Sequence, residues 1–529
     1  MWSCAMDRGS PAGSGKHSER VTWRRDAPYN RAMTTARSAT ALYTVEQVRS
    51  LDRIAIDECA IPGFELMQRA SASAFAMLSR RWPQARRLLV LAGDGNNGGD
   101  AFLLACIARA HGLVVRVFAL SETSRGEDAA AARAALLGDG QVIEVVDGET
   151  RLPTADLIVD GLFGTGLARA IEGPAAHLVA RLAECATPVL ALDVPSGLDA
   201  DTGIAGGAVV RADATVSFVG WKRGLFTADA RDLCGTLELA TLGMPGTVYA
   251  RVVADAELLD ADFAARLPLR RSNVNKGTFG HVLAIGGDDG MAGAVRLAAE
   301  AALRVGAGLV SVATRAAHVA ALNAARPELM ARGVDGPQSI TPMIERANAV
   351  ALGPGLGAGA WGHALWDAAL RAGRATVIDA DALNLLARSA IDLPQQAVLT
   401  PHPGEAARLL GVDIATIQSD RFAAARELAK RHRCVVVLKG SGSLVVDMHG
   451  RVAVCPFGNP GMASAGMGDV LTGIIAGLLA QGLDAWDAAC VGVVAHARAG
   501  DAAAGDTPRG LIASDLFGFL REMVNGEPG

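Results

Sequence analysis

The chain has 529 residues, of which 50% are hydrophobic and 4% aromatic, and its formal charge is −5 at pH 7. This length exceeds what one hydrophobic core supports, so two or three domains are expected. The acidic balance argues against a nucleic-acid partner. No apolar run reaches the ~18 residues of a membrane-spanning helix, so no membrane partner is expected.

The first forty residues differ in texture from the rest of the chain. They are polar, rich in Arg, Ser and Gly, and lack hydrophobic periodicity. No apolar segment follows the arginines, so a secretory signal is not expected. We predict that residues 1–40 are a disordered extension, or that translation starts at Met33.

The cysteines are scattered and form no C-x-x-C pair. This pattern favours reduced thiols over a disulfide framework or a zinc site, and it predicts a cytoplasmic protein. The eight positions are Cys4, Cys59, Cys106, Cys185, Cys234, Cys434, Cys455 and Cys490.

Residues 41–250 are predicted to form one α/β domain. Thr44 opens a helix and Gln47 follows three residues later, which is the pattern of a capping box; a second helix covers 64–82. From Arg86 onward, strand-like runs alternate with helical runs, which predicts a parallel sheet covered by helices on both faces. The buried face of the first helix should comprise Val48, Leu51 and Ala55.

Residues 251–272 are predicted to be a connector, after which the alternation of strands and helices begins again and continues to residue 525. The apolar run that starts at Val470 is predicted to be a buried helix. No short repeat relates the two halves, so we expect two different α/β domains in tandem, with the second at 273–525.

The loop at 93–98 matches G-x-G-x-x-G, the pattern that cradles a dinucleotide in Rossmann folds. Glu122 lies about where that motif expects a ribose-binding acid. However, two helical segments precede the loop, although a Rossmann unit usually opens with its strand. The loop also carries Asn96, Asn97 and Asp100, and Asp100 is expected at the start of the next helix, where the helix dipole favours a carboxylate.

Two further loops follow apolar strands and carry Asp160, Asp193 and Ser196. Loops after parallel strands converge at one edge of the sheet. Together with Asn97, these side chains offer hard oxygen ligands, and their low formal charge favours a monovalent cation. Asp193 is predicted to be the catalytic acid or base, because burial at a strand end raises a carboxyl pKa; the alternative is a turn-former before Pro195.

The motifs GNNGGD, DGLFGTGL and DVPSGLDADTG resemble those of the NAD(P)H-hydrate epimerase domain, over residues 42–245. The resemblance implies a Rossmann-like three-layer sandwich and a potassium ion held by Asn97, Asp160 and Ser196. It also implies contacts with the hydrated nicotinamide nucleotide from Asn96, Asn97, Gly98, Gly99, Asp100, Gly164, Thr165, Gly166, Leu167, Ala168, Arg169, Ala170 and Asp193.

In the second half, the turn at 466–468 delivers Asp469 to the start of the apolar helix. Backbone N–H groups at such a start can hold a transferring phosphoryl group. Asp469 is predicted to be the catalytic base that accepts the proton of a substrate hydroxyl. Taken alone, the pattern also fits an aspartate that merely caps a helix.

Other polar loops follow strands in this half. Lys439, with its Gly/Ser loop, suits a nucleotide phosphate or ribose, and His402 is held between two prolines as a substrate contact or a structural histidine. Glu405 is predicted to help position magnesium through water. No G-x-x-x-x-G-K-[ST] motif occurs, so this is not a Walker P-loop.

The second half resembles ribokinase-like kinases and, within them, the ADP-dependent NAD(P)H-hydrate dehydratases, from Asn275 to about residue 525. This resemblance implies Mg²⁺ and ADP as phosphoryl donor. It implies contacts with the hydrated cofactor from Ala294, Gly355, His402 and Asp469. Contacts with the nucleotide are implied for Lys439, Gly440, Ser441, Gly442, Ser443 and Gly468.

Both halves together resemble the bifunctional NAD(P)H-hydrate repair enzymes, in which an isomerase is joined to a lyase. The expected activity interconverts the 6R and 6S hydrates and dehydrates the S form at the expense of ADP. Partners are then both hydrate epimers and ADP, and the family suggests a homo-oligomer such as a tetramer. Three alternatives stay open: a vitamin or sugar kinase fused to a nucleotide-sensing domain, a Rossmann oxidoreductase, and a non-catalytic RNA-associated scaffold.

Overall fold

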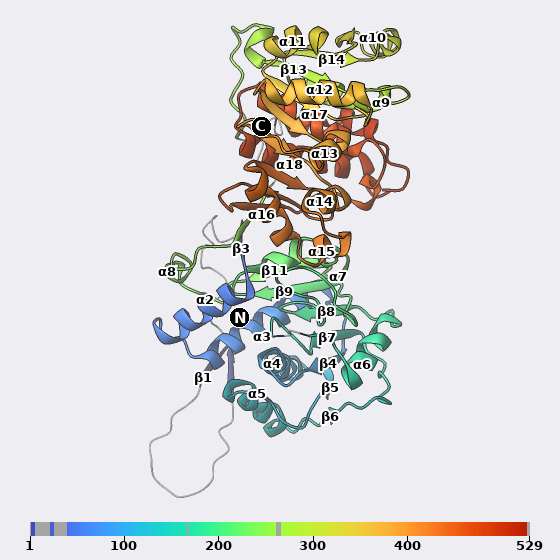
Figure 1. The fold of residues 1–529 in the computed structure, drawn as a ribbon. Coiled ribbons are helices and arrows are strands. Elements are labelled where there is room, and N and C mark those ends of the chain that lie inside the picture. The colour runs from blue at the N-terminus through green and yellow to red at the C-terminus, as the bar shows by residue number, and fades with distance from the viewer. Residues whose placement is uncertain (1, 6–21, 26–39, 167–168, 261–265, 526–529) are drawn as a thin grey trace, which may run out of the picture. The chain divides into compact units, whose positions relative to one another are not determined.

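The computed structural model describes residues 2–5, 22–25, 40–166, 169–260 and 266–525. The chain divides into two compact units, which are called unit 1 (Met1–Asp255) and unit 2 (Ala256–Gly529). Each unit is built around a sheet of mainly parallel strands with helices against it (Figure 1). The prediction of two tandem α/β domains is confirmed.

Most of the predicted extension lies outside the described residues. Within it, the short strands β1 (Trp2–Ala5) and β2 (Thr22–Arg25) pair antiparallel. The stretch predicted as a connector contains β12 (Ala256–Leu258), which pairs parallel with β21 (Val452–Cys455) in unit 2.

Unit 1 begins with the elements that its capping signals predicted. Helix α2 (Val45–Asp57) starts at a capping box, in which the Thr44 side chain accepts from the Gln47 N–H and the Gln47 side chain accepts from the Thr44 N–H. Its buried residues are Val48, Leu51 and Ala55, as predicted. Helix α3 (Gly63–Arg81) follows, and β3 (Ala41–Tyr43) pairs parallel with β10 (Trp221–Lys222).

The main sheet of unit 1 is parallel throughout, with strand order β11-β9-β8-β7-β4-β5-β6. Strand β4 pairs with β5 on one side and with β7 on the other. The strands that follow β4 in the sequence are therefore added first on one side of it and then on the other. Such switch points open a crevice at the carboxyl edge. The strands are β4 (Arg87–Ala92), β5 (Val114–Ala119), β6 (Ile143–Val145), β7 (Leu157–Gly161), β8 (Val189–Leu192), β9 (Ala214–Phe218) and β11 (Thr236–Ala240).

Helices cover both faces of this sheet and make two hydrophobic cores. One core gathers residues from α2, α3, α4 (Asn96–Ala110) and α5 (Glu127–Gly138), and the other gathers residues from α6 (Gly173–Ala183). In Figure 1, α4 and α6 lie on opposite sides of the strands. The predicted three-layer arrangement follows from these two cores. Shorter helical segments complete the unit: η1 (Arg223–Phe226), α7 (Ala230–Leu233) and α8 (Gly246–Tyr249).

The sheet of unit 2 runs β12-β21-β20-β19-β18-β17-β16-β13-β14-β15. Its pairs are parallel except for β19 with β20 and β20 with β21. Strand β13 pairs with both β14 and β16 and therefore marks a second switch point. The remaining strands are β13 (His281–Ile285), β14 (Leu309–Thr314), β15 (Met330–Gly333), β16 (Ala349–Leu352), β17 (Ala375–Ile378), β18 (Ala397–Leu399), β19 (Val435–Leu438) and β20 (Ser443–Val446).

Two long helices of unit 2, α17 (Met467–Ala480) and α18 (Ala485–Ala504), are largely buried. The prediction of a buried helix at Val470 is confirmed. In the part of the chain that the structure describes, no helix is long and apolar enough to cross a membrane. The other helices are α9 (Ala292–Arg304), α10 (Val319–Ala325), α11 (Pro337–Arg346), α12 (Ala360–Arg371), α13 (Ala380–Leu386), α14 (Pro403–Leu410), α15 (Ile414–Ser419), α16 (Arg421–His432) and α19 (Leu520–Met523).

Helix α17 packs directly on α9, and a glycine sets how closely the two backbones approach. A Cβ at Gly473 of α17 would overlap the carbonyl oxygen of Ala298 in α9. This contact holds the start of α17, which carries Asp469, at a fixed height above the sheet.

We predict that Gly473→Ala lowers the stability of the full chain by about 1–3 kcal/mol, because the added methyl forces α17 away from α9. Differential scanning calorimetry measures the change as a lower Tm. Gly293→Ala is the matched control, since that glycine lies in α9 with open space around it; it should be neutral or stabilise by up to about 1 kcal/mol. Equal Tm values for the two variants would contradict this account.

Candidate active sites

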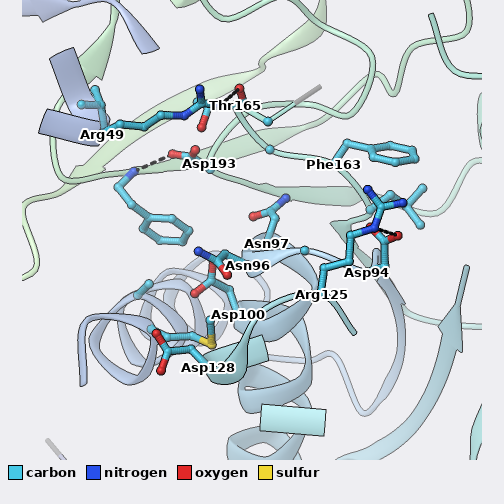
Figure 2. A pocket seen from close by; sticks show the side chains of 18 of the residues that line it. Arg49, Asp94, Asn96, Asn97, Asp100, Arg125, Asp128, Phe163, Thr165 and Asp193 are labelled. Atoms are coloured by element: carbon cyan, nitrogen blue, oxygen red, sulfur yellow. Dashed lines mark hydrogen bonds and ion pairs between the residues drawn. The ribbon is translucent and has the colours of Figure 1, made fainter. Parts of the chain in front are cut away.

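A cavity of about 1020 Å³ opens at the carboxyl edge of the unit 1 sheet. It is called the unit 1 cavity. The loops after β4 and β7, the residues that follow β8 and β9, and side chains of α2 and α3 line it (Figure 2). The cavity therefore lies at the switch point that the strand order creates.

Most of the predicted contacts in unit 1 line this cavity, namely Asn96, Asn97, Asp100, Gly164, Thr165, Gly166, Arg169, Ala170 and Asp193. Gly98 and Gly99 do not. A Cβ at Gly98 would overlap the carbonyl oxygen of Gly93, and one at Gly99 would lie 2.6 Å from the sulfur of Met67, so both glycines serve close packing. The predicted contacts Leu167 and Ala168 lie outside the described residues, and Glu122 is not among the lining residues.

Asp100 does not lie at the helix start, as the sequence had suggested. Helix α4 begins inside the glycine loop, with Gly95 as its N-cap, so Asp100 is one turn further along and buried. Burial raises the pKa of its carboxyl group well above the usual value, and the negative charges of Asp193 and Asp52 raise it further. This environment favours the neutral acid.

Lys222, which sequence reasoning missed, stands beside Asp193. Its ammonium donates to Oδ1 of Asp193, to Oγ of Ser217 at 3.1 Å and to the carbonyl of Phe218 at 2.7 Å. Asp193 follows β8 with a left-handed φ of 68° and also accepts from the N–H of Phe218 at 3.1 Å. A lysine four residues after the end of an apolar strand was the available signal.

Asp52 was also missed. It projects from α2 into the unit 1 cavity, and burial raises the pKa of its carboxyl group to about 6, with Lys222 opposing and Asp193 adding to the shift. Three carboxylates thus share the field of one ammonium group in this cavity.

Asp160 and Ser196, two of the three predicted cation ligands, are hydrogen-bonded to each other, and Asn97 lies beside the loop after β7, where a Cβ at Gly164 would lie 3.3 Å from that of Asn97. Oδ1 of Asp160 accepts from Oγ of Ser196 at 2.6 Å, and Oδ2 accepts from the N–H of Ser196 at 2.8 Å. Asp160 is wholly buried, which raises its pKa to about 6, and no cation contributes to that shift. Oδ1 of Asn97 is buried without a hydrogen-bond partner in the described part of the chain. A buried carboxylate and an orphaned amide oxygen are donors that suit a hard cation.

In unit 2, Asp469 lies in the first turn of α17 within a charged cluster. Nζ of Lys439 is 2.7 Å from Oδ1 of Asp379 and 3.8 Å from Oε2 of Glu405. Thr472 donates to Oδ2 of Asp379 at 2.8 Å. Asp379 directly follows β17, in the stretch Asp379-Ala380-Asp381.

The positive charge of Lys439 does not offset the negative charges of this cluster. Burial raises the pKa of Asp469 to about 7, and the charge of Asp379 adds to the shift while Lys439 opposes it. For Asp379 burial also raises the pKa, but Lys439 lowers it more, so that its net shift is downward. Asp379 therefore stays ionised and pairs with Lys439. Asp469, in contrast, can exchange a proton near neutral pH.

Gly468 allows these groups to come together. A Cβ at this position would lie 3.2 Å from Nζ of Lys439 and 3.4 Å from Oδ2 of Asp379. The predicted substrate contacts Gly355 and Ala294 are also neighbours, since a Cβ at Gly355 would lie 3.3 Å from that of Ala294.

His402 caps α14 rather than standing free in its loop. Its Nδ1 accepts from the N–H groups of Gly404 and Glu405, at 3.0 and 3.4 Å, while Oε2 of Glu405 accepts from the N–H of His402 at 2.8 Å. The reciprocal bonds fix the ring, and half of the side chain stays exposed.

The loop at 439–443, predicted to contact a nucleotide, rests on a buried arginine that sequence reasoning missed. The guanidinium of Arg421 donates to the carbonyls of Leu438, Lys439 and Gly442 at 3.3–3.4 Å. Within the loop, Oγ of Ser443 donates to the carbonyl of Gly440 at 3.1 Å. Arg421 thus holds the backbone of this loop from within the core.

The two folds and sites define an α/β enzyme in which a Rossmann-like unit precedes a ribokinase-like unit. The profile of the family described as "YjeF-related protein N-terminus" matches residues 63–224, and that described as "NAD(P)H-hydrate dehydratase" matches residues 282–521. The chain belongs to the family of bifunctional NAD(P)H-hydrate repair enzymes.

Curated relatives carry that name over almost the whole chain. The Coxiella burnetii enzyme is 45% identical over 92% of this chain and 100% of its own length, and the Escherichia coli enzyme is 42% identical over 92% and 94%. A solved structure, the ADP/ATP-dependent NAD(P)H-hydrate dehydratase from Bacillus subtilis co-crystallised with ATP/Mg²⁺, is 31% identical. It covers 49% of this chain and 94% of its own, with a TM-score of 0.46.

The ion pair in unit 2 gives a stability prediction. Lys439→Met leaves Asp379, whose side chain is 2% exposed, without its cation. Burial then raises the pKa of Asp379, so the variant should lose about 3 kcal/mol or more at pH 8 and less near pH 5, where the carboxyl group can take up a proton. Calorimetry of the full chain at both pH values measures this. Adding Asp379→Asn to Lys439→Met should recover most of the loss at pH 8; a double variant as unstable as the single one would contradict the assignment.

Proposed function

We propose that this chain repairs hydrated nicotinamide cofactors in two steps. Unit 1 interconverts the 6R and 6S forms of NAD(P)H hydrate, and unit 2 dehydrates the S form at the expense of a nucleotide. The observation that carries the proposal is that, in both units, the loops after parallel strands bring a lysine–aspartate pair together with a further carboxyl group whose pKa is raised. Family membership supports the substrate.

The epimerase step needs the C6 hydroxyl to leave and return. Protonation of the hydroxyl lets it depart as water while the ring N1 lone pair forms a planar iminium, and water then adds to either face. Asp193, which lines the unit 1 cavity, is the predicted acid or base for this exchange. The predicted contacts at 96–100 and 164–170 would hold the nucleotide across the cavity.

The dehydratase step uses kinase chemistry, because hydroxide is a poor leaving group. Asp469 would take the proton of the C6 hydroxyl as a phosphoryl group is transferred to it. Phosphate then departs from C6 with the C–O electron pair, C5 loses a proton, and the C5=C6 bond forms. The N–H groups at the start of α17 suit the transferring phosphoryl group. In-line transfer fixes the position of the hydroxyl, so only one epimer reacts.

The need for a single epimer explains why two activities belong on one chain. A stereospecific dehydratase leaves the other epimer behind, and the epimerase converts it. The lysine–aspartate pairs of both units argue against the alternative of a non-catalytic RNA-associated scaffold. A vitamin or sugar kinase would have no use for an epimerase.

The nucleotide of unit 2 is proposed to be ADP, held by the loop at 439–443 and Gly468, with Mg²⁺. The Bacillus subtilis relative is named as ADP/ATP-dependent and was crystallised with ATP/Mg²⁺. No group of three His, Cys, Asp or Glu side chains in the described ranges forms a metal site, which suits a Mg²⁺ ion bound mainly by nucleotide phosphates, with Glu405 reaching it through water.

We further propose that Asn97, Asp160 and Ser196 hold K⁺ and that the chain forms a homo-oligomer, with a tetramer as the expected state. Bound K⁺ would neutralise the buried Asp160 carboxylate and stiffen the loops that carry Phe163 and Ser196. A cytoplasmic setting is also proposed; the seven cysteines whose side chains are described are all free. Light scattering on the purified chain tests the oligomeric state.

The reaction is tested by recovery of the reduced-nicotinamide absorbance from mixed hydrate epimers. With ADP, the wild-type chain should convert both epimers, whereas Asp469→Asn should lose at least about 100-fold in rate. Because Asp469 acts as a carboxylate and burial places its pKa at about 7, the wild-type kcat/KM should rise as pH increases through 7 and then level off. A chain that phosphorylates a vitamin alcohol and ignores the hydrate would overturn the proposal.

The K⁺ site predicts a pH-dependent stabilisation. Without a cation, the pKa of Asp160 is about 6, so K⁺ should raise the Tm of the full chain at pH 8 and do so less at pH 5, where protonation competes. Choline chloride at equal ionic strength is the control. The effect should vanish in Asp160→Asn; identical Tm values in KCl and choline chloride at pH 8 would rule the site out.

A further inference from the structure

The ammonium group of Lys222 is fully engaged within the protein. The side chain is 1% exposed, and its three N–H donors meet three acceptors: Asp193, Ser217 and the carbonyl of Phe218. Lys222 has no donor left for a substrate. Its role must therefore act through Asp193, the one carboxylate that it touches.

Asp193 uses one of its oxygens for these internal bonds and keeps the other free. Oδ1 accepts from both Lys222 and the N–H of Phe218. For Oδ2, the described residues offer no hydrogen-bond donor, and the side chain, 13% exposed, lines the unit 1 cavity. Lys222 thus holds Asp193 as an anion and aims one oxygen at the substrate space.

Asp100 is in the opposite situation. It lines the same cavity, is buried, and within the described chain its carboxyl group makes neither a hydrogen bond nor an ion pair. The charged groups that act on it are the carboxylates of Asp193 and Asp52, which disfavour ionisation, and Lys222, which is already bound to Asp193. One ammonium group, already bound to Asp193, cannot offset the burial of Asp100 and the charges of its two neighbouring carboxylates, so Asp100 keeps its proton.

Figure 2 draws Asp193 and Asp100 on either side of Asn96 and Asn97, both facing the cavity. We propose that Asp100 and Asp193 divide the epimerase chemistry, with Asp100 as the acid, Asp193 as the base, and Lys222 and Asp52 as positioning residues that set this division. The inference rests on the proposed epimerase function of unit 1.

The steps balance as follows. Asp100 gives its proton to the C6 hydroxyl, the C–O bond breaks with its electron pair on oxygen, and water leaves while N1 and C6 form the iminium double bond. A water molecule then adds to C6 on the other face, and Oδ2 of Asp193 takes its proton. After these steps Asp193 is protonated and Asp100 is ionised. The reverse epimerisation starts from this protonation state of the enzyme.

The test starts from one purified epimer without ADP and follows formation of the other by chromatography. Asp100→Asn should slow this interconversion by about 100-fold or more. The ADP-dependent dehydration of the S epimer by unit 2 of the same molecule is the internal control for protein concentration and substrate, and calorimetry of the variant is the control for folding of unit 1. Asp139→Asn, an exposed pair with Arg109 at the end of α5, is the matched control and should keep the wild-type rate.

The pH profile separates this division of roles from a merely structural one. The wild-type rate should fall at alkaline pH, where Asp100 loses its proton. Asp52→Asn removes one of the two charges that keep Asp100 protonated, so this alkaline fall should move to lower pH. Lys222→Met removes the cation that lowers the pKa of Asp100, so the alkaline fall should move to higher pH.

The outcomes distinguish the two proposals. If the wild-type chain does not interconvert the epimers at all, the epimerase function itself fails. If it does, and Asp100→Asn keeps the wild-type rate, or the alkaline fall moves in neither Asp52→Asn nor Lys222→Met, only the division of acid and base is overturned.

Discussion

In both units, a lysine paired with an aspartate lies beside a further carboxyl group, Asp100 or Asp469, for which no ion pair is found in the described residues. Lys222 holds Asp193, and Lys439 holds Asp379. Moving a carboxylate out of water disfavours its charged form unless a cation is close. Since each site has one such cation and more than one carboxyl group, the pair stays ionised while a neighbour, Asp100 or Asp469, is driven towards its neutral form. The capacity to move protons near neutral pH follows from this shortage of positive charge.

The parallel sheets make this arrangement possible. Strands that run in one direction send all their following loops to one edge, and the switch at β4 or β13 opens space there. Glycines then let the backbones and the lysine approach more closely than any side chain would permit, as at Gly468 and Gly473. The two sheets differ in strand order but share one arrangement. In each, buried apolar strands support polar loops at the carboxyl edge of the sheet.

The sequence predicts the parts of this structure that depend on local signals. The capping box at Thr44, the alternation of strands and helices, the buried helix at Val470 and the meeting of Asp160 with Ser196 all follow from short patterns. Lys222 and Asp52 were not predicted as site residues, because each matters through a partner that is distant in the sequence. In the sequence, Asp52 is only one polar residue on an amphipathic helix. Asp100 was misplaced by a turn because α4 begins inside the glycine loop, where composition suggests a turn rather than a helix.

The backbone of Asp193 carries a further consequence. Its left-handed φ of 68° is a conformation that costs most residues roughly 1–2 kcal/mol and costs glycine almost nothing. A glycine at this position would relieve the strain, but it would also remove the counter-ion of Lys222, whose side chain is 1% exposed, and an unpaired buried cation costs about 3–5 kcal/mol. The ion pair therefore outweighs the backbone strain, and the unfavourable conformation is retained because it places this carboxylate beside the lysine.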